Sequence, residues 1–251
     1  MKSYETFIWV VLPYVALAVF AVGMFWRYRY DRYGWTTRSS QMYESRLLRW
    51  GSPLFHYGIL LALGGHVIGL LVPESWTSAA GISETTYHVV AVALGTVAAI
   101  MVVTGLTILI YRRRTVGRVF TVTTRMDKLM YVVLAAVILL GAWNTIGVNL
   151  LDVSGKYSGG YNYRDSVAVW FRSLFVLQPD ASGMAGAPPS FQLHAVAAMV
   201  LVALTPFTRL VHIFSAPVGY PSRPYLVYRS RDPRQQASRE PGAGWEPTRK
   251  A

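Results

Sequence analysis

Five stretches of the chain are apolar over roughly 20 residues, which is the length a helix needs to cross a hydrocarbon core about 30 Å thick. They lie at about residues 7–26, 54–72, 88–110, 129–150 and 191–214. Helices are predicted rather than a β-barrel, because a span must satisfy its own backbone hydrogen bonds and the chain shows no short alternating strands. The pattern predicts an all-α integral membrane protein, a five-transmembrane-helix bundle over residues 1–228.

The composition agrees with a membrane protein. The mean hydropathy is +0.33, 53% of the residues are hydrophobic and only 14% are charged, which is too apolar for an ordinary soluble domain. The first apolar stretch is interpreted as a retained span and not as a signal peptide. Its basic start is limited to Lys2, Pro13 interrupts it, and no small-residue cleavage site occurs before Arg27.

A long loop, residues 152–190, separates the fourth and fifth spans. Within it, apolar residues recur at helical spacing from Val167 to Phe175, beside Arg164, Asp165 and Arg172. This pattern predicts a short interfacial helix, which either packs on the rim of the bundle or acts as a lid.

Basic residues gather on one side of the predicted bundle. The segments after the first, third and fifth spans share one side and, together with Arg209 near the inner end of the fifth span, hold 20 of the 24 Lys and Arg residues; the others are Lys2, Lys156, Arg164 and Arg172. The positive-inside rule then predicts an N-terminus outside and a C-terminus in the cytoplasm. Topology accounts for the net charge of +12 without a nucleic-acid partner. Residues 229–251, rich in Pro, Gly and Arg, are predicted to form a disordered cytoplasmic tail.

Four of the five histidines lie inside predicted spans. His56 and His66 are on the second span, His194 and His212 are on the fifth, and His88 begins the third. An ionisable residue at membrane depth is costly and marks function by default, although one neutral His bonded to a carbonyl is a common structural solution. Two pairs on two helices favour a functional interpretation.

The predicted topology pairs these histidines by depth. The second and fifth spans run in opposite directions, so His56 and His212 lie near the cytoplasmic face, whereas His66 and His194 lie further out. At 1.5 Å per residue, the two histidines of a span are about 15 Å apart on the second span and about 27 Å apart on the fifth. We expect tilt and a kink at Pro206 to absorb this mismatch. Two stacked metal or haem sites bridged by two helices would need such an arrangement.

The available ligands favour haem over zinc. The chain has no cysteine, so iron–sulfur clusters, thiolate-bound zinc and thioether-attached haem are excluded from this subunit. A zinc site also needs a third and a fourth ligand, and the spans offer essentially no carboxylate. Two axial histidines saturate a haem iron and leave no position for oxygen chemistry, which points to electron transfer.

Small and basic residues accompany the histidines. The second span carries four glycines, Gly58, Gly64, Gly65 and Gly69. They leave room either for a flat macrocycle or for close helix packing. Three arginines lie near the inner pair, Arg46, Arg49 and Arg209. They either pair with haem propionates or serve topology alone.

Two histidine-bearing stretches and the segment after the first span carry recognisable motifs. They are Leu54–Leu60 (LFHYGIL), Gly64–Gly69 (GGHVIG), Leu193–Ala195 (LHA), Pro206–Val218 (PFTRLVHIFSAPV), Arg27–Tyr30 (RYRY), Tyr33–Trp35 (YGW) and Ser39–Met42 (SSQM). In these motifs the chain resembles the gamma subunit of respiratory nitrate reductase, a membrane cytochrome b. The resemblance covers the five spans, up to about Tyr228.

The resemblance implies a subunit that holds two b haems in series, oxidises menaquinol or ubiquinol near the outer haem and releases protons outside. Electrons would pass inward to a cytoplasmic iron–sulfur beta subunit and a molybdenum-containing alpha subunit, in a bacterial inner (plasma) membrane engaged in anaerobic respiration or nitrate metabolism. Carried over by motif, His56 and His212 would be the axial ligands of the inner haem iron, and His66 and His194 those of the outer haem iron.

The quinol site departs from the family pattern. The resemblance implies a basic residue at the outer end of the third span, where this chain has His88 beside Tyr87. We hypothesise that His88 binds a quinol oxygen or accepts its proton, since imidazole titrates near neutrality. The alternative is a wetted histidine at a helix end. Gly65, next to His66, is predicted to leave room for the quinol head group.

Three other functions stay open at this stage. A cytochrome b subunit of a related heterodisulfide or sulfite-type reductase belongs to the same class. A small proton-coupled permease with a histidine relay is disfavoured, because the spans show no inverted repeat and no mid-membrane Asp or Glu. A haem-free assembly or anchoring protein would tolerate replacement of all four span histidines.

Overall fold

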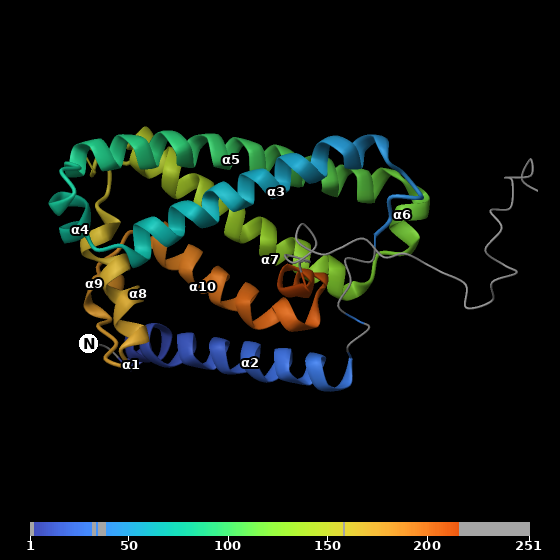
Figure 1. The fold of residues 1–251 in the computed structure, drawn as a ribbon, viewed down its shortest axis with the longest axis horizontal. Coiled ribbons are helices and arrows are strands. Elements are labelled where there is room, and N and C mark those ends of the chain that lie inside the picture. Colours follow the sequence, from blue (N-terminus) through green and yellow to red (C-terminus); the bar gives the residue numbers. More distant parts are fainter. Residues whose placement is uncertain (1–2, 32–33, 35–38, 158, 216–251) are drawn as a thin grey trace, which may run out of the picture. The chain divides into compact units, whose positions relative to one another are not determined.

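The computed structural model describes residues 3–31, 34, 39–157 and 159–215, and over these residues it contains helices, turns and loops but no strand (Figure 1). Five helical stretches are long and apolar enough to cross a membrane: Ser3–Tyr30, Arg46–Leu71, Glu84–Thr115, Arg125–Leu150 and Pro189–Phe207. The prediction of an all-helical, multi-pass membrane protein is therefore confirmed. The predicted tail lies outside the described residues, so the domain boundary at residue 228 stays a prediction.

Three spans change from α-helix to π-helix. The first consists of α1 (Ser3–Thr6), π-helix η1 (Phe7–Val11) and α2 (Leu12–Tyr30); the second of α3 (Arg46–His66) and π-helix η3 (Val67–Leu71). The third is α5 (Glu84–Thr115), and the fourth is α7 (Arg125–Ala142) with π-helix η4 (Trp143–Leu150). The short elements are α4 (Glu74–Ala79), α6 (Gly117–Thr121), η5 (Tyr163–Asp165), α8 (Val167–Phe175) and α9 (Ser182–Ala185).

The fifth span ends earlier than predicted. α10 (Pro189–Leu204) is followed by two 3-10 segments, η6 (Thr205–Phe207) and η7 (Arg209–Ser215), with Thr208 extended between them at φ −117° and ψ 176°. The prediction of a helix over 191–214 with a kink at Pro206 is therefore wrong about its end, because the α-helix stops at Leu204 and the chain continues as 3-10 segments. Pro206 is the cause, because it has no N–H for the helical ladder and its ring collides with the preceding turn.

The predicted loop helix is confirmed as α8. Together with α4 and α9 it lies at one end of the bundle, which we call the α8 end, and α6 lies at the opposite, α6 end (Figure 1). The Trp170 indole N–H donates to the Trp9 carbonyl at 2.7 Å, and the two rings meet edge to face at 5.8 Å between centroids. Met184 of α9 completes the buried cluster. These contacts hold α8 against the first span, on the rim of the bundle.

Small residues bring α3 and α5 together. A Cβ on Gly58 would collide with Val102, and one on Gly105 would collide with the backbone of Phe55, so both glycines permit close helix approach. On the α5 side of this α3–α5 interface, Val102 belongs to a buried hydrophobic cluster that also includes Leu134 of α7. At most 22% of the most apolar window of each span is buried, as expected for helices whose outer faces meet lipid.

Candidate functional site

The structure brings the four span histidines together as two pairs. His56 of α3 and His212 of η7, the inner pair, have ring centroids 6.3 Å apart and planes inclined by 66°. His66 of α3 and His194 of α10, the outer pair, have centroids 6.0 Å apart and planes inclined by 28°. These are the same two pairs that the depth of the residues predicted, and the names inner and outer follow that prediction.

Each of the four rings is held through Nδ1. Nδ1 of His56 lies 2.7 Å from the carbonyl oxygen of Ser52, and Nδ1 of His66 lies 2.7 Å from that of Ala62. Nδ1 of His194 lies 3.0 Å from the carbonyl oxygen of Val137, and Nδ1 of His212 lies 2.5 Å from that of Arg209. Because a carbonyl only accepts, Nδ1 carries the proton in each ring, and in the neutral imidazole Nε2 then keeps its lone pair. A hydrogen bond of this kind fixes the tautomer and orientation of metal-ligating histidines.

The spacing within each pair fits a single iron atom. An imidazole nitrogen binds a transition metal at about 2.0 Å, so two rings on opposite sides of a haem iron have centroids roughly 6 Å apart. Among the described residues there is no group of three or more His, Cys, Asp or Glu side chains that could hold a metal ion. A zinc site would need such a group, whereas haem needs two imidazoles.

The glycines near the histidines have different surroundings. No atom lies within 4 Å of the position that a Cβ would take on Gly64 or Gly65, so these two leave open space beside His66. A Cβ on Gly141 of α7 would approach the His194 ring at 3.0 Å. Gly69 instead packs against the hydroxyls of two tyrosines. Among the four glycines predicted on the second span, only Gly64 and Gly65 therefore leave open space, which suits either the edge of a macrocycle or a quinol head group.

His88 lies away from Gly65. It is half-buried near the start of α5, and a Cβ on Gly160, in the loop after α7, would collide with its imidazole ring. Gly160 itself has φ +93°, a conformation that suits glycine. No atom of His88 lies within 4 Å of the position that a Cβ would take on Gly65, so the structure shows no contact between these two predicted quinol residues on that side of Gly65.

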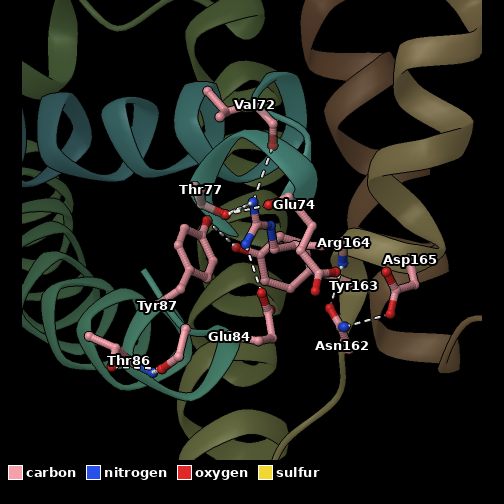
Figure 2. A network of polar contacts seen from close by, with 11 residues as sticks. Val72, Glu74, Thr77, Glu84, Thr86, Tyr87, Asn162, Tyr163, Arg164 and Asp165 are labelled. Carbon is pink, nitrogen blue, oxygen red and sulfur yellow. Dashed lines mark hydrogen bonds and ion pairs between the residues drawn. The ribbon is translucent and has the colours of Figure 1, made fainter. Parts of the chain in front are cut away.

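A buried arginine at the α8 end was not predicted. Arg164 is 2% exposed, and its guanidinium pairs with Glu84 at 2.8 Å, donates to the Thr77 hydroxyl at 3.0 Å and lies 3.9 Å from the Tyr87 ring centroid (Figure 2). The hydroxyl of the neighbouring Tyr163 lies 3.2 Å from that of Tyr87. Burial raises the pKa of the Tyr163 hydroxyl, which therefore stays protonated. Arg164 thus ties η5 to α4 and to the start of α5.

Two loop arginines also bind the end of the helix that carries His66. Arg164 donates to the Val72 carbonyl at 3.4 Å, and Arg172 of α8 donates to the Leu70 carbonyl at 3.1 Å. Carbonyls at a helix C-terminus carry partial negative charge, which cations stabilise. The sequence showed both arginines beside an amphipathic pattern but gave no sign that they turn inward.

The arginines near the inner pair differ from one another. Arg209 forms a two-point ion pair with Asp127 at the start of α7, with Nε–Oδ1 2.7 Å and Nη2–Oδ2 2.6 Å. Arg46 and Arg49 are exposed. The ion pair with Asp127 gives Arg209 a role within the fold that neither the propionate nor the topology interpretation anticipated.

Five membrane-length helical stretches with two facing imidazole pairs among them define a multi-pass membrane protein with two candidate haem-binding sites. The nitrate reductase gamma subunit family matches residues 5–231, and the chain belongs to this family. Its relatives include gamma chains of nitrate reductase, an oxidoreductase complex. The recognition of this family from the histidine motifs is thus confirmed.

The chain is similar to gamma chains of about its own length and to part of a longer protein. The chain is 41% identical to the nitrate reductase gamma chain of Bacillus subtilis, over 89% of this chain and 97% of that protein. It is 34% identical to the respiratory nitrate reductase 2 gamma chain of Escherichia coli, over 90% and 97%. It is 58% identical to the nitrate reductase-like protein NarX of Mycobacterium tuberculosis over 89% of its own length, but spans only 34% of that protein.

Proposed function

We propose that this chain is the quinol-oxidising, di-haem cytochrome b subunit of a membrane-bound nitrate reductase. The observation that carries the proposal is the presence of two facing imidazole pairs, each ring with Nδ1 held by a carbonyl and Nε2 left with its lone pair. His56 and His212 would hold one b haem and His66 and His194 the other. When bound, the two haems would supply one-electron transfer along the bundle.

The orientation in the membrane rests on charge. Described basic residues gather at the α6 end, where Arg29 lies in the last turn of α2, Arg46 begins α3 and Arg112–Arg114 lie in the last turn of α5. We therefore place this end and the C-terminus in the cytoplasm and the N-terminus outside, in a bacterial inner membrane. An iron–sulfur beta subunit and a molybdenum-containing alpha subunit would receive the electrons on the cytoplasmic side. The absence of cysteine agrees with this division, because this chain has no ligands for iron–sulfur clusters.

Quinol oxidation would take place at the α8 end. Conversion of one quinol to its quinone releases two electrons and two protons, and at this end the protons would leave to the outside. Open space beside Gly65 and His66 gives access for a quinol head group. His88, half-buried near the start of α5, would bind a quinol oxygen or accept a proton.

The haem spectrum of the purified chain tests this proposal. We expect a bis-imidazole b-type spectrum with two haems per chain, loss of one haem in His66→Ala or His194→Ala, and loss of the other in His56→Ala or His212→Ala. Colourless protein from haem-sufficient cells would contradict the proposal and favour a histidine relay. Loss of both haems in every single variant would indicate structural roles instead. Copurification with a molybdenum subunit that does not reduce nitrate would favour a related reductase.

A further inference from the structure

His212 is the one span histidine that does not lie on an α-helix. It follows the break at Pro206, on the 3-10 segment η7, and its Nδ1 bonds to the carbonyl three residues back, whereas His56 and His66 bond four residues back. A regular helix positions a side chain through its continuous hydrogen-bond ladder. η7 has 3-10 hydrogen bonds of its own, but the extended Thr208 separates it from the ladder of α10, so contacts with other helices must fix where η7 and His212 lie.

Side chains from two other spans supply those contacts. Arg27 of α2 donates from Nε to the Pro206 carbonyl at 2.6 Å and so holds the break. Asp127 of α7 holds the following residues through the two-point pair with Arg209. Asp127 is 3% exposed, and a bidentate arginine–carboxylate pair fixes direction as well as distance.

The Asp127 carboxylate is itself held rigidly. Its Oδ2 accepts the Thr124 backbone N–H at 2.9 Å, and its own N–H donates to the Thr124 hydroxyl at 3.1 Å, which together cap the start of α7. The carboxylate is therefore a fixed point from which Arg209 reaches η7. The carbonyl of the same Arg209 accepts the proton of the His212 imidazole.

We propose that Asp127 is a positioning residue for the inner haem site, which sets the place and plane of the His212 ring through Arg209. The inference rests on the proposed function, since it assigns a role toward a bound haem. Asp127 does not itself ligate the iron. Removing its charge takes away the two-point pair that fixes the direction of Arg209, so the segment that carries His212 loses this attachment to α7 and the imidazole ring shifts.

The test compares Asp127→Asn with a matched control in the purified chain. Glu44→Gln removes a different carboxylate–arginine pair, the one with Arg112. In Asp127→Asn we expect two haems per chain, a shifted low-spin electron paramagnetic resonance signal and a shifted midpoint potential for the inner haem, and an unchanged outer haem. The control should keep the wild-type signals of both haems.

Arg209→Lys provides a second variant should Asp127→Asn fail to accumulate. It keeps the charge but loses the two-point geometry, so it should shift the inner haem signal as well. Wild-type signals in both variants, or equal changes at both haems, would overturn the positioning role. Colourless wild-type protein would instead overturn the proposed function, so the two failures are distinguishable.

Discussion

The imidazole rings of His66 and His194 lie nearly parallel, inclined by 28°, whereas those of His56 and His212 are inclined by 66°. Parallel axial ligands act on the same iron d orbital and separate its two π-type orbitals, whereas strongly inclined ligands leave the two close in energy. We therefore expect the inner haem to give the more anisotropic low-spin signal in electron paramagnetic resonance of the oxidised protein.

The assignment uses one variant for each pair. His66→Ala should leave the more anisotropic signal, and His56→Ala should leave the less anisotropic one. If the signal that survives in His66→Ala is instead the less anisotropic of the two, the ring orientations in the haem-bound protein differ from those described here.

Gly141 lies against the outer pair from a helix that bears none of its ligands. A Cβ at this position would approach Cε1 of His194 at 3.0 Å, which is closer than ordinary van der Waals contact. In Gly141→Ala we expect the ring to be displaced, so that the outer haem is lost or its signal shifts while the inner haem stays. Gly117→Ala is the control, because no atom lies within 4 Å of its Cβ position. Equal spectra for the two variants would contradict the prediction.

Hydropathy and depth predicted much of this arrangement. The five spans, helix α8 and the two histidine pairs follow from apolar run length, helical spacing and the antiparallel course of the second and fifth spans. The end of α10 at Leu204 was missed, because Pro206 was interpreted as a kink within one helix and not as its end. The π-helical segments were missed as well, because hydropathy does not show whether a backbone N–H bonds to the carbonyl four or five residues back.

Long-range polar contacts were also beyond the sequence pattern. Arg164 meets Glu84 across 80 positions, and Arg209 meets Asp127 across 82. Counting charges on each side of the membrane predicts on which side such an arginine lies, but it does not predict which carboxylate the arginine pairs with. Only the packed structure shows that Arg164 is buried, that Arg209 is half-buried, and that each ties a loop or a broken helix to another span.

The Arg164–Glu84 pair should stabilise the α8 end. Its arginine side chain is 1% exposed and its glutamate 35%. Glu84→Gln leaves a buried guanidinium without its anion, and we expect it to lower the free energy of unfolding by about 3 kcal/mol, the low end for breaking a buried pair, because Glu84 is partly exposed. Thermal unfolding of the purified protein in detergent measures the change.

Glu74→Gln is the matched control for that variant. Repulsion from Glu84 raises the pKa of the Glu74 carboxyl, so removing its charge relieves repulsion and should leave stability unchanged or slightly higher. The role assigned to the Arg164 pair fails if Glu84→Gln and Glu74→Gln unfold at the same temperature.

Glu44 should give the α6 end an acid-sensitive contact. Burial alone would raise the pKa of its carboxyl, but the hydrogen bond from the Leu47 N–H and the Arg112 guanidinium offset this and hold the pKa below its ordinary value of 4.5. A carboxyl with a lowered pKa in the folded state adds stability that is fully present above the ordinary value and is lost as the pH falls through the folded value. Unfolding temperatures measured down to about pH 3.5 should therefore fall less steeply in Glu44→Gln than in wild type. Parallel curves would exclude this contribution.

His88 offers the sharpest test of the quinol site. Its ring lies against Gly160 near the start of α5 and belongs to neither imidazole pair, so its replacement should leave both haems in place. If His88 accepts a quinol proton, His88→Ala should lower turnover at limiting quinol by about 100-fold, the lower range for loss of a general base. His88→Lys should restore part of the activity and move its pH optimum upward, because the ammonium group titrates at higher pH than imidazole.

Quinol oxidation is measured with artificial quinols at saturating nitrate, after haem content has been matched by absorbance. Unchanged turnover of His88→Ala at limiting quinol would show that this histidine is only a wetted residue at a helix start.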